Sequence, residues 1–220
     1  MLESTYLTIG RSFFGICIAG LGLVHFILPG IRPIFAPLPP EQVWEPLGYF
    51  LGAALTFLGT AIVINKAKPT VSLCLGILLL LFFLFGHVPQ RIMHQPGILG
   101  YWTDAIKLLA LGGGAFVLAC ITQKGEPVTV VENLAKVGYI GRYLYAVMLV
   151  LFGIDHFLYH DLIKTLVPGW IPEPLLWTYI TGVALMGSGV SIIINFKVEL
   201  ISVLLASMLF LWLAILHLPA

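Results

Sequence analysis

Apolar residues run through the chain in seven long stretches, which short polar breaks separate. A transmembrane α-helix needs roughly 20 consecutive, mostly apolar residues, and each stretch is close to that length. Prolines, glycines and charged residues gather in the breaks, where they stop helices or form turns. The pattern predicts membrane-spanning helices over residues 8–28, 46–64, 70–88, 102–121, 142–159, 175–194 and 200–218, with a polar linker over 122–140.

The overall composition agrees with this pattern. Hydrophobic residues make up 60% of the chain, charged residues make up 10%, and the mean hydropathy is +1.04. Charged residues are about a quarter of an ordinary soluble domain. The sequence therefore predicts an all-α membrane protein that crosses the bilayer several times.

Charge and cysteine content exclude other classes. The net charge is +1 and no run of lysines and arginines occurs, so a nucleic-acid partner has no support. The three cysteines lie singly in apolar stretches, and without a Cys-x-x-Cys motif neither a disulfide framework nor a dithiol relay is indicated. The N-terminal segment carries Glu3 and no positive region, which indicates a retained first span and not a cleaved signal peptide.

The positive-inside rule orients the predicted helices. With the N-terminus in the cytoplasm, seven lysines and arginines fall on the inner side and three on the outer side. We therefore expect a cytoplasmic N-terminus and an external C-terminus. The inner residues are Arg11, Lys66, Lys68, Lys124, Lys136, Arg142 and Lys197.

Two parts of the chain repeat one another. Matching residues are offset by 131 positions in the first helix of each part and by 130 positions after the following loop. Two unrelated apolar helices would match mainly in leucine and isoleucine, whereas these match in Arg, His, Asn and Pro, in the same order. The sequence therefore predicts a duplication. The matches include Gly10-Arg11 with Gly141-Arg142, His25-Phe26 with His156-Phe157, Tyr49 with Tyr179, Gly52 with Gly182, Gly59 with Gly189, Asn65 with Asn195, and His87-Val-Pro89 with His217-Leu-Pro219.

An even number of spans separates the two copies, so both cross the membrane in the same direction. This predicts a parallel repeat about an axis along the membrane normal, unlike the inverted repeats of many transporters. We expect a four-helix bundle in residues 1–121, a cytoplasmic linker in 122–140, and a second repeat of three helices in 141–220.

Histidines are the leading candidates for a site. In the predicted orientation His25, His87, His156 and His217 lie near the outer ends of the first, third, fifth and seventh spans. Ionisable groups at membrane depth are costly and often functional, and a neutral imidazole can ligate a metal or haem or hydrogen-bond a quinone carbonyl. In the alternative interpretation, these histidines hydrogen-bond loop carbonyls and fix helix ends. The sequence leaves both interpretations open.

Asp155 is a weaker candidate, beside His156. Residues four apart share a helix face, so His156 and His160 with Asp155 suggest a metal site. The first copy has Val24 and Pro29 at the positions of Asp155 and His160. We therefore assign no metal, and expect Asp155 to pair with His156 or another cation.

Lys107 lies inside the fourth span, three residues after Asp104. An ion pair with Asp104, or extension of the lysine to the outer interface, explains it without a function. A lysine that faces the bundle near the histidines would instead belong to the site.

Small and aromatic residues indicate packing. Gly52 and Gly59, with their copies Gly182 and Gly189, allow helices to approach closely in lipid. Most tryptophans fall at the outer boundary, as an aromatic belt does. Trp212 is the exception, because it lies inside the last predicted span.

Several of these motifs resemble the DoxX-like membrane proteins. Gly-x-x-His-Phe, Val-Pro-x-Trp-Ile-Pro and Tyr-x-x-Gly follow one another over residues 153–182. Trp102-Thr-Asp-Ala-Ile-Lys107, followed by Gly112-Gly-Gly-Ala115, is similar to the fourth helix of that family. The resemblance covers one full copy and one copy of three helices. The first copy departs from the loop motif, with Ala36-Pro-Leu-Pro-Pro40 in its place.

The resemblance implies a small helical bundle in the bacterial cytoplasmic (inner) membrane. Founding relatives are subunits of thiosulfate:quinone oxidoreductase, which implies a redox-associated accessory subunit more than a stand-alone enzyme, with other membrane-complex subunits and lipids as partners. A quinone or haem site at the outer face would use His25, His87, His156 and His217, with weaker roles for Asp155 and Lys107. The alternatives are a structural scaffold without cofactor and a small-molecule transporter.

Overall fold

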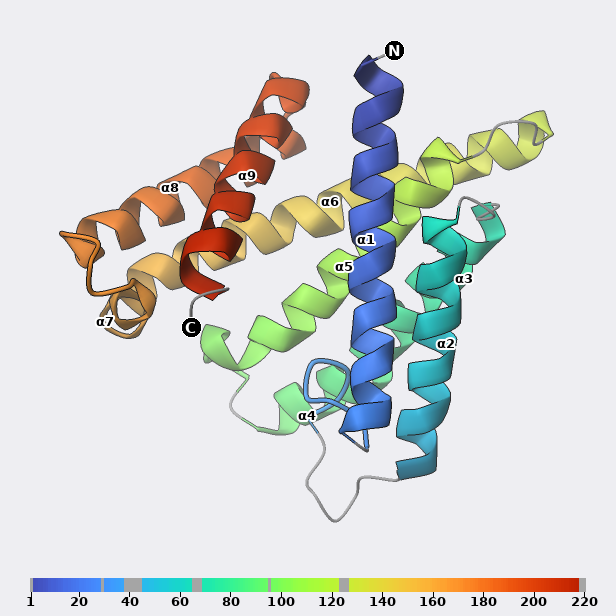
Figure 1. Cartoon of the computed structure of the whole chain (residues 1–220), viewed down its shortest axis with the longest axis horizontal. Coiled ribbons are helices and arrows are strands. Elements are labelled where there is room, and N and C mark those ends of the chain that lie inside the picture. The colour runs from blue at the N-terminus through green and yellow to red at the C-terminus, as the bar shows by residue number, and fades with distance from the viewer. Residues whose placement is uncertain are drawn as a thin grey trace. The chain divides into compact units, whose positions relative to one another are not determined.

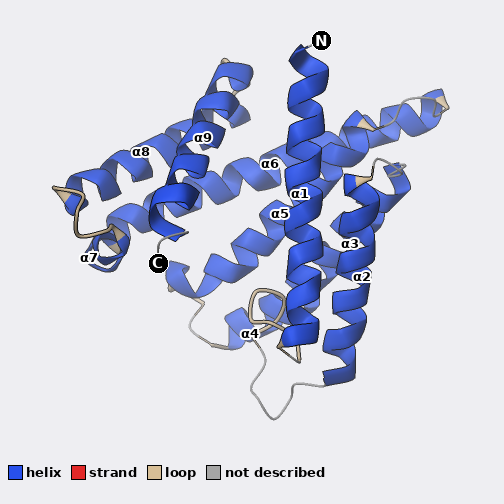
Figure 2. Cartoon of the chain, in the orientation of Figure 1, coloured by secondary structure: helices blue, strands red, loops and turns tan. Residues whose placement is uncertain are grey.

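The structure is a computed structural model, which describes residues 2–28, 30–37, 45–64, 69–94, 96–122 and 127–217. Within these ranges, the side chains of residues 5 to 215 are described. Every regular element in these ranges is a helix (Figure 2). Seven helical stretches are long and apolar enough to cross a membrane, which confirms the predicted all-α class and is compatible with a multi-pass membrane protein. They are Thr5–Ile27, Glu45–Val63, Pro69–Met93, Leu99–Ile121, Val128–Leu158, Pro174–Ile193 and Val198–Ile215.

The chain divides into two compact units, Met1–Gly141 (unit 1) and Arg142–Ala220 (unit 2). In unit 1, α1 packs along α2, and α3 packs along α5 (Figure 1). The third span continues from α3 through a π-helical turn, η2, into α4. The elements are α1 (Leu2–Ile27), α2 (Glu45–Val63), α3 (Pro69–Leu81), η2 (Phe82–His87), α4 (Val88–Met93), η3 (Leu99–Trp102) and α5 (Thr103–Ile121).

The fifth helix, α6 (Val128–Leu158), begins earlier than the predicted start at residue 142, so that residues 128–140 of the predicted polar linker are helical. Charged residues such as Glu132 and Lys136 suggested a linker. However, Leu134, Gly138 and Gly141 form a stripe at helical spacing that packs on α5. Leu134 is buried, and a methyl group on Gly138 would lie 2.6 Å from the Cβ of Cys120. With 31 residues, α6 is about 46 Å long, more than the bilayer core of about 30 Å requires.

The segment after α1, residues 30–37, folds back into unit 1. Ile31, Phe35 and Ala36 are buried in the hydrophobic core that α1, α2, α3 and α5 form. Glycines leave room for this segment. A methyl group on Gly86 would lie 2.7 Å from the carbonyl oxygen of Phe35, and one on Gly48 would lie 2.7 Å from the carbonyl carbon of Gly30.

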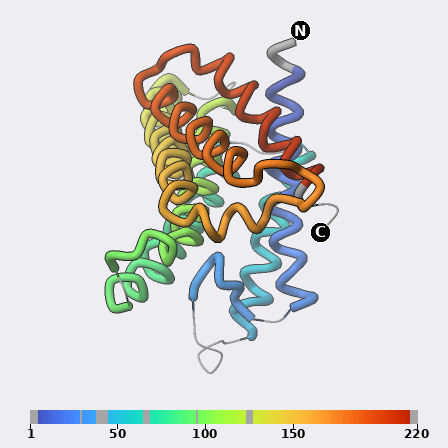
Figure 3. Tube along the Cα trace, turned by 90° about the vertical axis from the view of Figure 1, so that its left-hand side faces the viewer, coloured from blue at the N-terminus to red at the C-terminus, as the bar shows by residue number. Residues whose placement is uncertain are grey.

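Unit 2 contains the end of α6 and two further long helices. Short helical turns and a loop join α6 to α8, and α8 packs against α9 (Figure 3). Its core is smaller than that of unit 1 and includes Ala146, Leu149, Leu185, Ile192 and Leu205. The elements after α6 are α7 (His160–Ile163), η4 (Lys164–Leu166), α8 (Pro174–Ile193), α9 (Val198–Trp212) and η5 (Leu213–His217).

The contact of α1 with α2 recurs between α6 and α8 at the offsets of the sequence repeat. A methyl group on Gly52 would lie 2.8 Å from the Cβ of His25, and one on Gly182 would lie 2.9 Å from the Cβ of His156. The expected packing role of these glycines is confirmed. Aromatic stacking recurs as well, between Phe26 and Tyr49 with ring centroids 6.2 Å apart and between Phe157 and Tyr179 at 5.3 Å.

Candidate binding pocket

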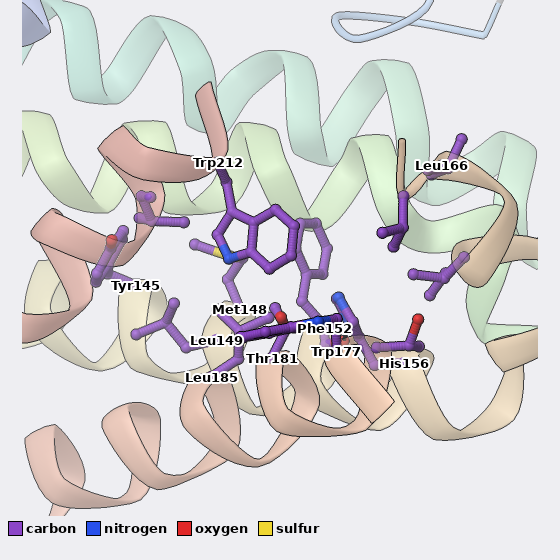
Figure 4. Close-up of a pocket in the computed structure, with 14 residues that line it drawn as sticks. Tyr145, Met148, Leu149, Phe152, His156, Leu166, Trp177, Thr181, Leu185 and Trp212 are labelled. Atoms are coloured by element: carbon purple, nitrogen blue, oxygen red, sulfur yellow. Dashed lines mark hydrogen bonds between the residues drawn. The ribbon is translucent and has the colours of Figure 1, made fainter. Parts of the chain in front are cut away.

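Unit 2 contains a pocket of about 490 Å³ between α6, α8, α9 and the segment that joins α6 to α8 (Figure 4). On α6, Tyr145, Phe152 and His156 line it from one face of the helix, because they follow the spacing of helical turns. Tyr145 and His156 lie towards opposite ends of the pocket, and Trp212 reaches into it from α9 (Figure 4). Trp177 lines the pocket and is 40% exposed, so the pocket opens to the surface.

More than half of the residues that line the pocket in unit 2 are the repeat counterparts of residues in the core of unit 1. Eight of the fourteen lining residues match, at the repeat offsets, residues of the unit 1 core or residues packed against that core. The same helix faces that enclose a filled core in unit 1 therefore enclose a pocket in unit 2. The pairs are Tyr145 with Phe14, Leu149 with Ile18, Phe152 with Leu21, Trp177 with Leu47, Thr181 with Leu51, Leu185 with Leu55, Leu209 with Leu79, and Trp212 with Phe82.

Unit 1 fills this space with side chains from residues 30–37 and from α5. Phe35 is the largest of the inserted side chains; its ring centroid lies 5.3 Å from that of His25 and 5.8 Å from that of Phe82. In unit 2, none of the residues from 156 to 177 is buried. The pocket is open because the joining segment stays at its rim, and because the described part of unit 2 holds no counterpart of α5.

His156 is the predicted site residue that lines the pocket. Its Nδ1 lies 2.7 Å from the carbonyl oxygen of Phe152, one turn earlier on α6. A carbonyl oxygen accepts hydrogen bonds, so Nδ1 carries the proton. In the neutral form of the ring, Nε2 is then an acceptor.

The structure brings His25 and His87 to the same inserted segment of unit 1. Nδ1 of His25 donates to the carbonyl of Leu21 at 2.8 Å, and its ring packs on Phe35. Nε2 of His87 donates to the carbonyl of Ile34 at 2.9 Å. Both side chains are fully buried in a filled core. These contacts favour the structural interpretation for this pair, in which the histidines hold the inserted segment.

Two other predicted residues are not placed in the pocket. The side chain of His217 lies outside the described ones. Asp155 is buried and does not line the pocket. Among the described side chains no ion pair joins Asp155 to a cation, and its Oδ1 has no hydrogen-bond partner. The expected pairing of Asp155 with His156 or another cation therefore stays a prediction.

The expected ion pair of Lys107 with Asp104 is present, with Nζ and Oδ1 3.3 Å apart. The two side chains are 44% and 37% exposed, so Lys107 does not enter the core of unit 1. This geometry favours the ion-pair interpretation over the one in which Lys107 faces the bundle.

Past the end of α6, Asp161 takes a hydrogen bond of 2.6 Å from Lys164, which lowers the pKa of its carboxyl group. Nε2 of His160 lies 3.5 Å from the other carboxylate oxygen. Across the described ranges, no three His, Cys, Asp or Glu side chains gather as metal ligands.

The chemistry of the lining restricts the ligand. None of the lining residues is a lysine, arginine, aspartate or glutamate, and most are apolar or aromatic. A haem brings two carboxylates, for which the lining residues offer no cationic partner. These lining residues fit a neutral, ring-bearing molecule. Sequence reasoning missed Trp177 and Tyr145, while the unusual position of Trp212 inside a span was an indication of the pocket.

No family model, curated protein or solved structure matches this chain. The assignment of a function therefore depends on the pocket and on the sequence pattern.

Proposed function

We propose that the chain is a duplicated, DoxX-like membrane protein that serves as a redox-associated accessory subunit and binds a quinone-type ring in the unit 2 pocket. One observation carries this proposal: an open pocket stands where the matching space of unit 1 is filled by Phe35 and its neighbours. The first copy comprises α1, α2, α3 and α5, and the second, parallel copy comprises α6, α8 and α9. The recurring contacts of His25 with Gly52 and of His156 with Gly182 support the duplication.

The ring of the ligand takes the place that Phe35 has in unit 1. Phe35 packs between His25 and Phe82, and the matching residues, His156 and Trp212, both line the pocket. Aromatic side chains favour edge-to-face or offset contacts with a ring, which add about 0.5–1.5 kcal/mol to the burial of apolar area. An apolar tail leaves the pocket beside Leu166, which lines the pocket and is 65% exposed.

Tryptophan fluorescence tests this proposal directly, since quinones quench indole emission and two tryptophans line the pocket. The purified protein in detergent is titrated with a short-tailed benzoquinone. We expect saturable quenching, much of which is lost in Trp212→Phe. Trp102→Phe is the matched control, because the Trp102 indole donates to the carbonyl of Pro96 in unit 1. Equal, non-saturating quenching in both variants would contradict the proposal, as would the absence of quinone from an organic extract of the purified protein.

The membrane orientation is part of the same proposal: bacterial cytoplasmic membrane, N-terminus inside, and the His156 end of the pocket outside. Gly169 and Phe196 lie beyond opposite ends of α8. A side chain at Gly169 meets nothing within 4 Å, and Phe196 is 55% exposed, so cysteines are tolerated at both positions. After replacement of the native cysteines, an impermeant maleimide should label Gly169→Cys in intact cells and Phe196→Cys only in opened cells. The reverse pattern overturns this orientation.

The proposed partners of the chain are other subunits of a membrane complex and lipids. The accessory role predicts that the chain co-purifies with the catalytic subunits of a redox complex under mild detergent. Purification of the chain alone, with full activity in the remaining complex, argues against an accessory role and leaves the pocket assignment untouched.

A further inference from the structure

Two polar groups at the His156 end of the pocket, those of His156 and Thr178, can accept a hydrogen bond from a ligand, whereas the indole N–H of Trp177, which also lines the pocket near His156, donates (Figure 4). Nδ1 of His156 donates its hydrogen to the carbonyl of Phe152 at 2.7 Å, so that in the neutral form of the ring Nε2 has a lone pair and no hydrogen. The imidazole cannot reverse these roles without giving up the bond to Phe152. This end of the pocket therefore presents an acceptor to a ligand.

Thr178, which also lines the pocket, has the same character. Its hydroxyl group donates its single hydrogen to the carbonyl of Pro174 at 2.9 Å, and the side chain is only 2% exposed. Its oxygen can then only accept a hydrogen bond from a ligand. Thr178 precedes Gly182 by one helical turn, and Gly182 packs against His156, so both acceptors belong to the same region. Tyr145 lies towards the opposite end of the pocket from His156 (Figure 4).

We infer that the unit 2 pocket selects a hydroxyarene, a ring whose O–H group donates to Nε2 of His156, over the corresponding ether. Among quinone-type ligands, the reduced hydroquinone form carries such an O–H group. The inference rests on the proposed function, and it adds which hydrogen-bonding partner the site requires. An ether oxygen placed against Nε2 of His156 would face an acceptor and lose its bond to water without replacement.

Two air-stable probes of nearly equal shape test this selectivity, para-heptylphenol and its methyl ether, para-heptylanisole. Isothermal titration calorimetry on the full chain in detergent, corrected for partition of each probe into empty micelles, gives the two dissociation constants. We expect the phenol to bind about tenfold more tightly, the value of one buried hydrogen bond of about 1.4 kcal/mol. Equal binding of the two probes, or tighter binding of the ether, overturns the inference and leaves the proposed function standing. No binding of either probe overturns both.

Variants assign the selectivity to His156. His156→Phe keeps a ring against Gly182 and removes Nε2, so the phenol should fall to the affinity of the ether while the ether binds as before. His160→Phe is the matched control. His160 is the next histidine along the chain, does not line the pocket, and hydrogen-bonds the carbonyl of Phe157 outside it. The control should retain the tenfold preference. Retention of the full preference in His156→Phe overturns the assignment, and if this variant does not fold, the two-probe comparison on the native chain still decides.

Discussion

The ring centroid of Phe35 lies 5.3 Å from the ring centroid of His25, and both side chains are fully buried in unit 1. Through this contact Phe35, which belongs to the segment that folds back after α1, fills the core of unit 1. In unit 2 the matching histidine, His156, has no such ring from its own loop and lines the pocket. The two units thus differ chiefly in what covers the histidine.

Removal of the inserted ring should open unit 1. Phe35→Ala leaves a cavity beside His25 and Phe82, and a buried Phe→Ala change typically costs about 3–5 kcal/mol. We expect a clear fall in the thermal unfolding midpoint in detergent. Phe57→Ala serves as the control, since Phe57 is 71% exposed on α2 and should leave the midpoint nearly unchanged. Equal midpoints for the two variants would mean that residues 30–37 do not stabilise the core.

Close approach of α6 and α8 depends on Gly182, where a methyl group would lie 2.9 Å from the Cβ of His156. Gly182→Ala should destabilise unit 2 by about 1–3 kcal/mol, the usual cost of overpacking. Gly187→Ala lies on the same helix with no atom within 4 Å of the added carbon, so the better helix propensity of alanine should keep or raise the midpoint. Thermal unfolding of the pair measures the difference, and destabilisation by Gly187→Ala alone would contradict this packing.

Composition and apolar length were sufficient to predict the seven spans, because a span needs only enough consecutive apolar residues. They were insufficient at the start of α6. Glu132 and Lys136 look like linker residues in the sequence, and only the contact of Gly138 with Cys120 on α5 shows why this part is helical.

The pocket could not be predicted from the sequence for a related reason. Residues 30–37 and the segment between α6 and α8 both contain prolines and aromatic residues, and nothing in their composition says which one enters its core. Phe35 is fully buried, whereas Trp170 is 71% exposed. Insertion depends on room between helices, which Gly48 and Gly86 provide in unit 1. His156 was predicted from the repeat, but its aromatic surroundings come from helices far apart in the sequence.

Lys107 should matter little to either stability or ligand binding. Its ion pair with Asp104 is 3.3 Å long and about as exposed as an ordinary surface pair, and such pairs contribute about 0–1 kcal/mol. Lys107→Met should shift the thermal midpoint slightly and leave the quinone titration unchanged. A large loss of binding in Lys107→Met, with Asp104→Asn unaffected, would show that the lysine acts on the ligand after all.

Filling the pocket separates a binding role from a packing role. Thr181 lines the pocket at the position that Leu51 occupies in the core of unit 1. Thr181→Phe places a larger apolar side chain in the space of the ligand, so binding of the benzoquinone should weaken at least tenfold, equivalent to about 1.4 kcal/mol. The thermal midpoint should hold or rise, since a cavity is filled with apolar contacts.

Val183→Phe is the control on the same helix, because Val183 is 59% exposed and does not line the pocket. Fluorescence titration measures both variants. Unchanged binding in Thr181→Phe, with a normal midpoint, would place the quinone elsewhere.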